Sequence, residues 1–310
     1  MASFSAYLAC LLLPLSSALA CVNDPSTDLN GKQARHSVLG DTHNLLFSLD
    51  RKIPLAPPVY HTEPPASLAK KLEAEALTLI YAGNYSAALP LLQNAEATAP
   101  GDYSIAANLG TTLELLGDNA AALNWITEAV RRNPESHRGT EWVHVLVLEA
   151  KLRDAGAPGS SLRQPLVAIP EHIQPDTRLA VAGTLRSAAS IREALNYQLT
   201  ERMTFVKPKD PYVADLLYSL AVLEANLASV ESARIVLSLA ERYGYRDTAR
   251  IQHLRDAIDR ALWISRSWLI AKWTGALSLF VAALYYACRR KWLFLTRRAY
   301  RAHKESLKNP

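Results

Sequence analysis

The chain has 310 residues, of which 49% are hydrophobic and 20% are charged, with 12 Gly, 17 Pro and 3 Cys. This composition lies outside the disordered and collagen-like ranges, so we expect a packed globular protein. Three cysteines are too few for a disulfide framework or a four-thiolate metal site. The net charge of +5 is concentrated in residues 289–310, which hold eight of the 34 Lys and Arg residues and one of the 29 acidic residues. The rest of the chain is nearly neutral, which argues against nucleic acid as a partner.

Residues 1–20 have the layout of a secretory signal peptide. The first 23 residues contain no charged side chain, and the apolar run 6–15 is followed by the small-x-small sequence Ala18-Leu19-Ala20. Cleavage is expected between Ala20 and Cys21. Because no Lys or Arg precedes the apolar run, an uncleaved anchor helix stays open as an alternative. A lipid-modified Cys21 is a second alternative, because a bacterial lipoprotein carries its acylated cysteine directly after the cut.

Residues 21–67 differ from the rest of the chain and show little helical periodicity. Five prolines fall in the short run 54–65, at positions 54, 57, 58, 64 and 65. Such a segment is expected to be extended and polyproline-like. It would act as a spacer, or it would lie back along the folded body and occupy part of a groove.

A period of 34 residues follows in the middle of the chain. Four residues, Gly83, Ala88, Ala95 and Pro100, recur 34 positions later as Gly117, Ala122, Ala129 and Pro134. Between these positions the apolar residues keep helical spacing. Each glycine marks a tight turn between two helices, and each proline stands where the second helix must end.

This period and these residues resemble the tetratricopeptide repeat (TPR) family, whose helix-turn-helix units stack into a right-handed solenoid. The matched copies are residues 69–102 and 103–136. A third first-helix is expected from about Arg138 to Arg153, so the repeat region is placed at 68–153. Small residues are expected where the helices approach closely, because a larger side chain there would overpack by roughly 1–3 kcal/mol.

The solenoid is expected to be interrupted after this region. Residues 154–176 form an irregular insert, because a partner helix is prevented by Gly156, Pro158, Gly159 and Pro165. A short strand is predicted at 166–169. Helical patterning returns within residues 177–264, first from about Thr177 to Val206 and then in a repeat-like copy at 211–244. We expect both stretches to stack into one curved body, because three or more units are needed to bury a continuous core.

Residues 267–288 predict one transmembrane helix. Their only charged side chain, Lys272, lies near the start, from where its long stem can reach the interface. A run of this length spans a hydrocarbon core of about 30 Å. The alternative is a buried apolar helix of the folded body. The predicted fold class is therefore all-α, an interrupted TPR-like α-solenoid with one C-terminal transmembrane helix.

The basic cluster 289–291 follows the predicted span directly. Lys and Arg beside a span stay on the cytoplasmic side. The predicted protein is therefore single-pass in the cytoplasmic (inner) membrane, with its N-terminal bulk outside, in the periplasm, and its C-terminus in the cytoplasm. The tail 289–310 mixes aromatic and aliphatic residues with basic ones, which suits a short helix on an anionic leaflet. A solvated tail that only marks topology is the alternative.

In the TPR family the first helices of the repeats line a concave groove. The resemblance therefore implies the groove residues of this chain, which are Lys70, Glu73, Leu77, Tyr81, Ala107, Thr111, Glu114, Leu115, Arg138, Glu141 and Glu149. Carboxylates outnumber cations in this set, so the expected ligand is a protein or peptide with some basic character. The pair Glu201 and Arg202 is interpreted as surface charge.

The sequence contains no Gly-rich phosphate loop, Ser nucleophile elbow or closely spaced Cys/His ligand set. His137, Glu141 and His144 are spaced to share one helix face, where they could bind a divalent metal in a hydrolase-type enzyme. The favoured function is non-enzymatic and needs no cofactor: a membrane-anchored scaffold or assembly factor that binds a protein or peptide. A self-associating structural subunit of an envelope complex is the third alternative.

Overall fold

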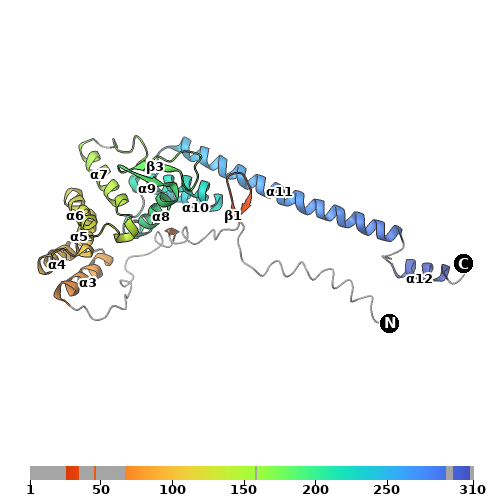
Figure 1. The fold of residues 1–310 in the computed structure, drawn as a ribbon, viewed down its shortest axis with the longest axis horizontal. Helices are drawn as coiled ribbons and strands as arrows, with labels where there is room; N and C mark the ends of the chain where they lie inside the picture. The colour runs from red at the N-terminus through yellow and green to blue at the C-terminus, as the bar shows by residue number, and fades with distance from the viewer. Residues whose placement is uncertain (1–25, 35–44, 47–66, 158, 291–295, 308–310) are drawn as a thin grey trace.

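The structure is a computed structural model that describes residues 26–34, 45–46, 67–157, 159–290 and 296–307. Helices dominate these residues, and they form a packed body from which one long helix extends (Figure 1). The predicted signal peptide, its cleavage pair Ala20 and Cys21, and the proline run at 54–65 lie outside the described residues.

Two antiparallel helix pairs form the first part of the body. They are α3 (Leu68–Tyr81) with α4 (Tyr85–Thr98), and α5 (Tyr103–Leu115) with α6 (Asn119–Arg132). Left-handed glycines begin the turn inside each pair, Gly83 with φ 77° and Gly117 with φ 92°. A residue without a Cβ adopts this backbone at no steric cost. The predicted 34-residue period therefore corresponds to one helix pair.

Close helix approach explains the small residues of the period. A Cβ added to Gly110 on α5 would lie 2.6 Å from Ile126 Cδ1 on α6. Ala88 and Ala122 occupy the matching positions of the two second helices and are fully buried. Larger side chains at these places would force the paired helices apart.

The third first-helix begins later than predicted. Residues Ser136–Gly139 form a short 3-10 turn, in which His137 and Arg138 have φ values of 48° and 61°. This left-handed backbone cannot continue into a right-handed helix. Helix α7 therefore spans Trp142–Gly156, and the prediction that it starts near Arg138 is wrong.

A β-hairpin follows the predicted insert, in the stretch from about Thr177 where a helix was predicted. Strands β3 (Arg178–Val181) and β4 (Thr184–Ser187) pair antiparallel, with Val181 opposite Thr184. Positive φ values at Ala182 and Gly183, 49° and 72°, form the two-residue turn between them. No strand occurs at 166–169 within the described insert, so the predicted strand lies in the wrong place.

The second helical region packs around a central helix. It consists of α8 (Ala188–Phe205), α9 (Pro211–Leu227) and α10 (Val230–Tyr243). Helix α9 is buried on most sides, and the largest apolar core of the described chain surrounds it. The helix pair predicted at 211–244 is present as α9 and α10, and Gly244 ends it in a left-handed cap.

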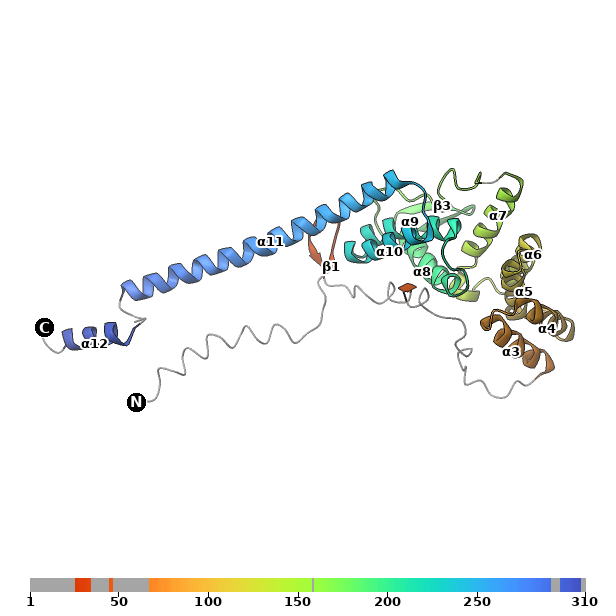
Figure 2. The same ribbon diagram turned by 180° about the vertical axis from the view of Figure 1, so that it is seen from behind.

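Helix α11 (Thr248–Arg289) has two parts with different surroundings. Up to Ser265 one of its faces is buried, through residues that include Ile258 and Ala261. Beyond this point its apolar side chains are exposed, as Leu279 is at 75%. An 18-residue window of α11 has a mean hydropathy of 1.4 and no buried residue, so α11 is a candidate membrane span. Both views show it leaving the body, with α12 (Arg297–Ser306) beyond it (Figures 1 and 2).

A small N-terminal hairpin packs near the point where α11 leaves the body (Figure 2). Strands β1 (Ser26–Thr27) and β2 (Gln33–Ala34) pair antiparallel, and the Thr27 N–H donates to Glu231 Oε2 at 2.9 Å. Gly31 lies so close to Ile264 that an added Cβ would come within 2.6 Å of it. This described part of the segment 21–67 therefore lies against the second helical region and away from the first helix pairs.

Candidate functional site

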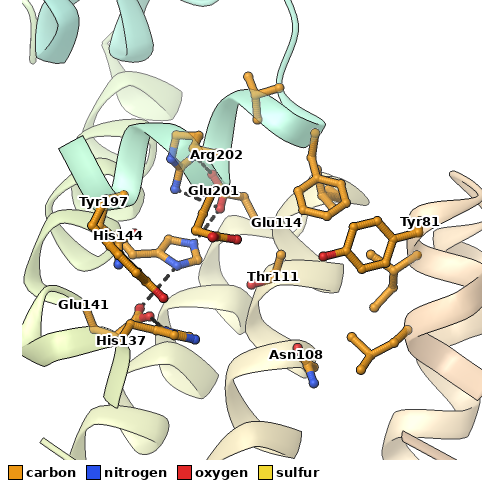
Figure 3. A pocket seen from close by; sticks show the side chains of 16 residues that line it. Tyr81, Asn108, Thr111, Glu114, His137, Glu141, His144, Tyr197, Glu201 and Arg202 are labelled. Atoms are coloured by element: carbon orange, nitrogen blue, oxygen red, sulfur yellow. Dashed lines mark hydrogen bonds and ion pairs between the residues drawn. The ribbon is translucent and has the colours of Figure 1, made fainter. Parts of the chain in front are cut away.

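A cavity of about 150 Å³ lies between the first helices of the repeats and the C-terminal half of α8 (Figure 3). Both helical regions contribute to its wall. The lining residues are Leu77, Ile80, Tyr81, Asn108, Thr111, Glu114, Leu115, His137, Glu141, His144, Tyr197, Gln198, Glu201, Arg202, Phe205 and Val206. We call this space the concave cavity, because α3 and α5 present to it the side that faces away from α4 and α6.

The concave cavity brings together six of the predicted groove residues. They are Leu77 and Tyr81 on α3, Thr111, Glu114 and Leu115 on α5, and Glu141. Figure 3 shows the Tyr81 hydroxyl pointing into this space from the α3 side. The other predicted groove residues, Lys70, Glu73, Ala107, Arg138 and Glu149, do not line it.

Lys70 and Glu73 belong to a polar cluster that joins α3 to α5. Lys70 Nζ lies 2.8 Å from Glu73 Oε2 and 2.6 Å from Asp102 Oδ2. Glu73 Oε1 accepts hydrogen bonds from Ser104 Oγ at 2.6 Å and from Asn108 Nδ2 at 3.0 Å. The Glu73 side chain is only 8% exposed. It therefore connects two helices and offers no free charge to a ligand.

The remaining three residues face elsewhere. Ala107 is buried beside Trp125. Glu149 is exposed on α7 and lies 3.8 Å from Arg153. Arg138 is also exposed, and its guanidinium lies 5.3 Å from the centre of the Tyr197 ring, at the rim of the concave cavity.

Glu114 is the buried centre of an ion-pair network. Its carboxylate lies 2.6 Å from His144 Nε2, 2.7 Å from Lys151 Nζ and 2.7 Å from Arg202 Nη1, and its side chain is 5% exposed. Burial opposes ionisation, but the charges of Arg202, His144 and Lys151 outweigh it and hold the pKa of Glu114 well below its usual range. The ionised carboxylate thereby joins α5, α7 and α8 (Figure 3).

The interpretation of Arg202 as surface charge is wrong. Its side chain is 8% exposed and pairs with Glu114, which lies 88 residues earlier in the sequence. Phe205 follows on the same helix, and its ring centroid lies 5.4 Å from that of Tyr81. In the sequence, one signal pointed to a shared surface: Arg202 and Phe205 are spaced to lie on one face of α8. Glu201 is exposed and lines the concave cavity.

His137, Glu141 and His144 come together, but not on one helix face, because His137 lies in the left-handed turn before α7. Glu141 lies between the histidines: its Oε1 is hydrogen-bonded to His137 Nδ1, and its Oε2 lies 3.5 Å from His144 Nδ1. With Glu114 at Nε2, both ring nitrogens of His144 face carboxylates. Within the described ranges no three His, Cys, Asp or Glu side chains are arranged to hold a metal ion. The geometry therefore gives the metal-site alternative no support.

The two histidines are tuned toward their charged forms. The hydrogen bond to Glu141 raises the pKa of His137, with burial opposing it. Burial lowers the pKa of His144, but the charge and hydrogen bond of Glu114 outweigh this effect and raise it. These carboxylates and imidazoles are paired with one another, so the arrangement resembles a structural charge network rather than a set of reacting groups.

Comparison with known proteins identifies the repeats. The family model described as tetratricopeptide repeat matches residues 79–139, which extend from the end of α3 to the turn before α7. No curated protein and no solved structure gives a match. The family match, the 34-residue period and the stacked helix pairs agree, and the chain therefore contains tetratricopeptide repeats at these residues.

Proposed function

We propose that this protein is a membrane-anchored scaffold or assembly factor that binds a protein partner in its concave cavity. One observation carries the proposal: six residues implied by the family pattern line one cavity, at the surface where TPR solenoids hold peptides. TPR repeats are typically non-catalytic protein-interaction modules. The polar groups of the cavity support binding over catalysis, because Glu114 and Glu141 are engaged with basic side chains of the same chain.

The proposed anchor is the exposed part of α11. Its apolar side chains are exposed in the described body. Burying them in lipid is favourable by about 25 cal/mol for each Å² of apolar surface that is removed from water. The basic residues that follow favour a cytoplasmic C-terminus with the tail on the anionic leaflet, so the repeat body lies outside the cytoplasm. In this arrangement the solenoid presents its cavity to partners in the extracytoplasmic space.

Photo-crosslinking in intact membranes tests the proposed partner surface. A photoreactive amino acid replaces Thr111, which lines the concave cavity, or Thr127, an exposed residue of α6 on the opposite side. We expect a discrete crosslinked protein from position 111 and none from position 127. Equal crosslinking from both positions, or none from either, would contradict the proposal.

A further inference from the structure

We propose that the concave cavity is a socket for a single basic side chain, Lys or Arg, of the bound partner, with Glu201 as the carboxylate that receives its charge. This inference rests on the proposed function and specifies the ligand at the same site. Four features of the cavity support it: its size, a carboxylate without a direct partner, a buried carboxylate oxygen without a hydrogen bond, and its apolar wall.

The size of the concave cavity fits one side chain. Its volume of about 150 Å³ is below the roughly 300–1,000 Å³ of sites that enclose small molecules. Helix α8 causes this restriction, because Phe205 packs on Tyr81 and Arg202 pairs with Glu114 across the surface of the first helices. A peptide segment would therefore lie outside and send one residue inward.

The carboxylate of Glu201 favours a cationic ligand in the concave cavity. Both terminal nitrogens of Arg202 donate to Glu114, at 2.7 and 3.2 Å, so this guanidinium is not available to an incoming anion. Glu201 lines the same space and is exposed, and its side chain forms no hydrogen bond or ion pair with the described residues. The Glu201 carboxylate therefore has no direct partner, and only its longer-range field acts on His137.

Glu141 supplies an independent observation. Its side chain is 6% exposed and lines the concave cavity, and its buried Oε2 atom has His144 Nδ1 at 3.5 Å but accepts no hydrogen bond within the described chain. A buried acceptor without a hydrogen bond carries a free-energy cost. A ligand cation nearby would offset part of this cost. Both carboxylates also raise the pKa of His137, Glu141 mainly through its hydrogen bond and Glu201 through its charge, so a positive charge is favoured at this place.

The wall of the concave cavity suits the stem of a long basic side chain. Leu77 and Leu115 offer apolar surface for its methylene groups, and Tyr81 and Phe205 offer aromatic rings. Lys and Arg bury their stems along apolar surface while their heads remain polar, and ring faces attract cations. An acidic ligand side chain would meet Glu201 and be repelled.

The test compares two small probes on the full chain in detergent micelles. The probes are N-acetyl-arginine methylamide and its neutral analogue with citrulline in place of arginine, and binding is followed by saturation-transfer NMR. We expect at least fivefold tighter binding of the arginine probe. In Glu201→Gln the preference should fall below twofold. The matched control, Glu193→Gln, changes an exposed carboxylate of the same helix that does not line the cavity, and should keep the preference.

Equal binding of the two probes to the unsubstituted chain would overturn the socket, and so would a preference that survives in Glu201→Gln. A misfolded Glu201→Gln chain would be recognised by its circular dichroism spectrum. The salt dependence of the arginine preference in the unsubstituted chain then decides, since a charge contact weakens with salt. If crosslinking from position 111 persists while the probe preference is absent, the cation socket fails and the partner surface stands. If both are absent, both proposals fail.

Discussion

Arg202 on α8 and Glu114 on α5 form a buried ion pair that connects the two helical regions of the chain. The two side chains are 8% and 5% exposed, and their closest atoms, Nη1 and Oε1, lie 2.7 Å apart. No other charge pair of the described cavity wall spans so long a stretch of sequence. This pair fixes α8 across the first helices and so shapes the concave cavity.

We expect Glu114→Gln to destabilise the protein by about 3 kcal/mol, because it leaves Arg202 and Lys151 facing a neutral group in a buried site. The measurement is urea unfolding of the detergent-solubilised full chain, followed by circular dichroism. The control Glu149→Gln breaks an exposed pair and should change the free energy of unfolding by less than about 0.5 kcal/mol. Similar losses in both variants would show that the buried network does not join the regions.

Gly110→Ala should destabilise the helix pair α5 and α6. The new Cβ would lie 2.6 Å from Ile126 Cδ1, so the helices must separate or Ile126 must change rotamer, at a cost of roughly 1–3 kcal/mol. Gly156→Ala is the matched control, because a Cβ at Gly156 on α7 meets no atom within 4 Å. Comparison of the two melting temperatures checks this prediction. An unchanged melting temperature for Gly110→Ala would contradict the close packing.

Asp215 should make stability fall as the pH rises. Burial raises the pKa of Asp215 to about 6 in the folded chain, against 3.8 for the free group, although its hydrogen bond from the Leu166 N–H opposes the shift. A raised carboxyl pKa means that the folded state holds its proton more tightly. The contribution is therefore fully present below pH 4 and is lost as the pH rises through 6, by about 3 kcal/mol at most.

The check is the difference in the free energy of unfolding between the unsubstituted chain and Asp215→Asn, measured from pH 4 to pH 7. We expect the difference to change in favour of Asp215→Asn as the pH rises. A difference that stays constant over this range would show that Asp215 keeps its ordinary pKa.

The proposed topology predicts opposite labelling of the repeat body and of the C-terminal tail. A cysteine introduced at Thr127 should react with a membrane-impermeant maleimide added to sealed cells. A cysteine introduced at Ser306 should react only after the cells are permeabilised, and the unsubstituted chain gives the background from native cysteines. Labelling of position 306 in sealed cells, with position 127 protected, would reverse the proposed orientation.

The repeats and the candidate span were predictable because their signals are local. Gly83 and Gly117 mark turns that only left-handed backbone closes well, and the uncharged run after Trp273 needs no tertiary information to be recognised. The turn at Ala182-Gly183 also has a local signal, because glycine favours left-handed backbone, but the helical pattern of the following segment predicts a helix from about Thr177.

The contribution of α8 to the concave cavity was not predictable in the same way. Arg202 pairs with a residue 88 positions away, and its place in the interior depends on how the insert returns the chain to the first helices. The left-handed turn at His137 and Arg138 is a similar case, since a positive φ is uncommon for residues other than glycine and two in succession are not expected from the sequence. The family pattern located the α3 and α5 residues of the cavity, and only the tertiary fold located those of α8.

The most direct test of the partner surface uses Thr111→Trp, which fills the concave cavity, and Thr127→Trp, which adds the same ring to the opposite side. Each full-length variant is titrated with the partner recovered by crosslinking from position 111, after circular dichroism has confirmed its helical fold. The account predicts at least tenfold weaker binding for Thr111→Trp and a change of less than twofold for Thr127→Trp. Unchanged affinity in Thr111→Trp would contradict it.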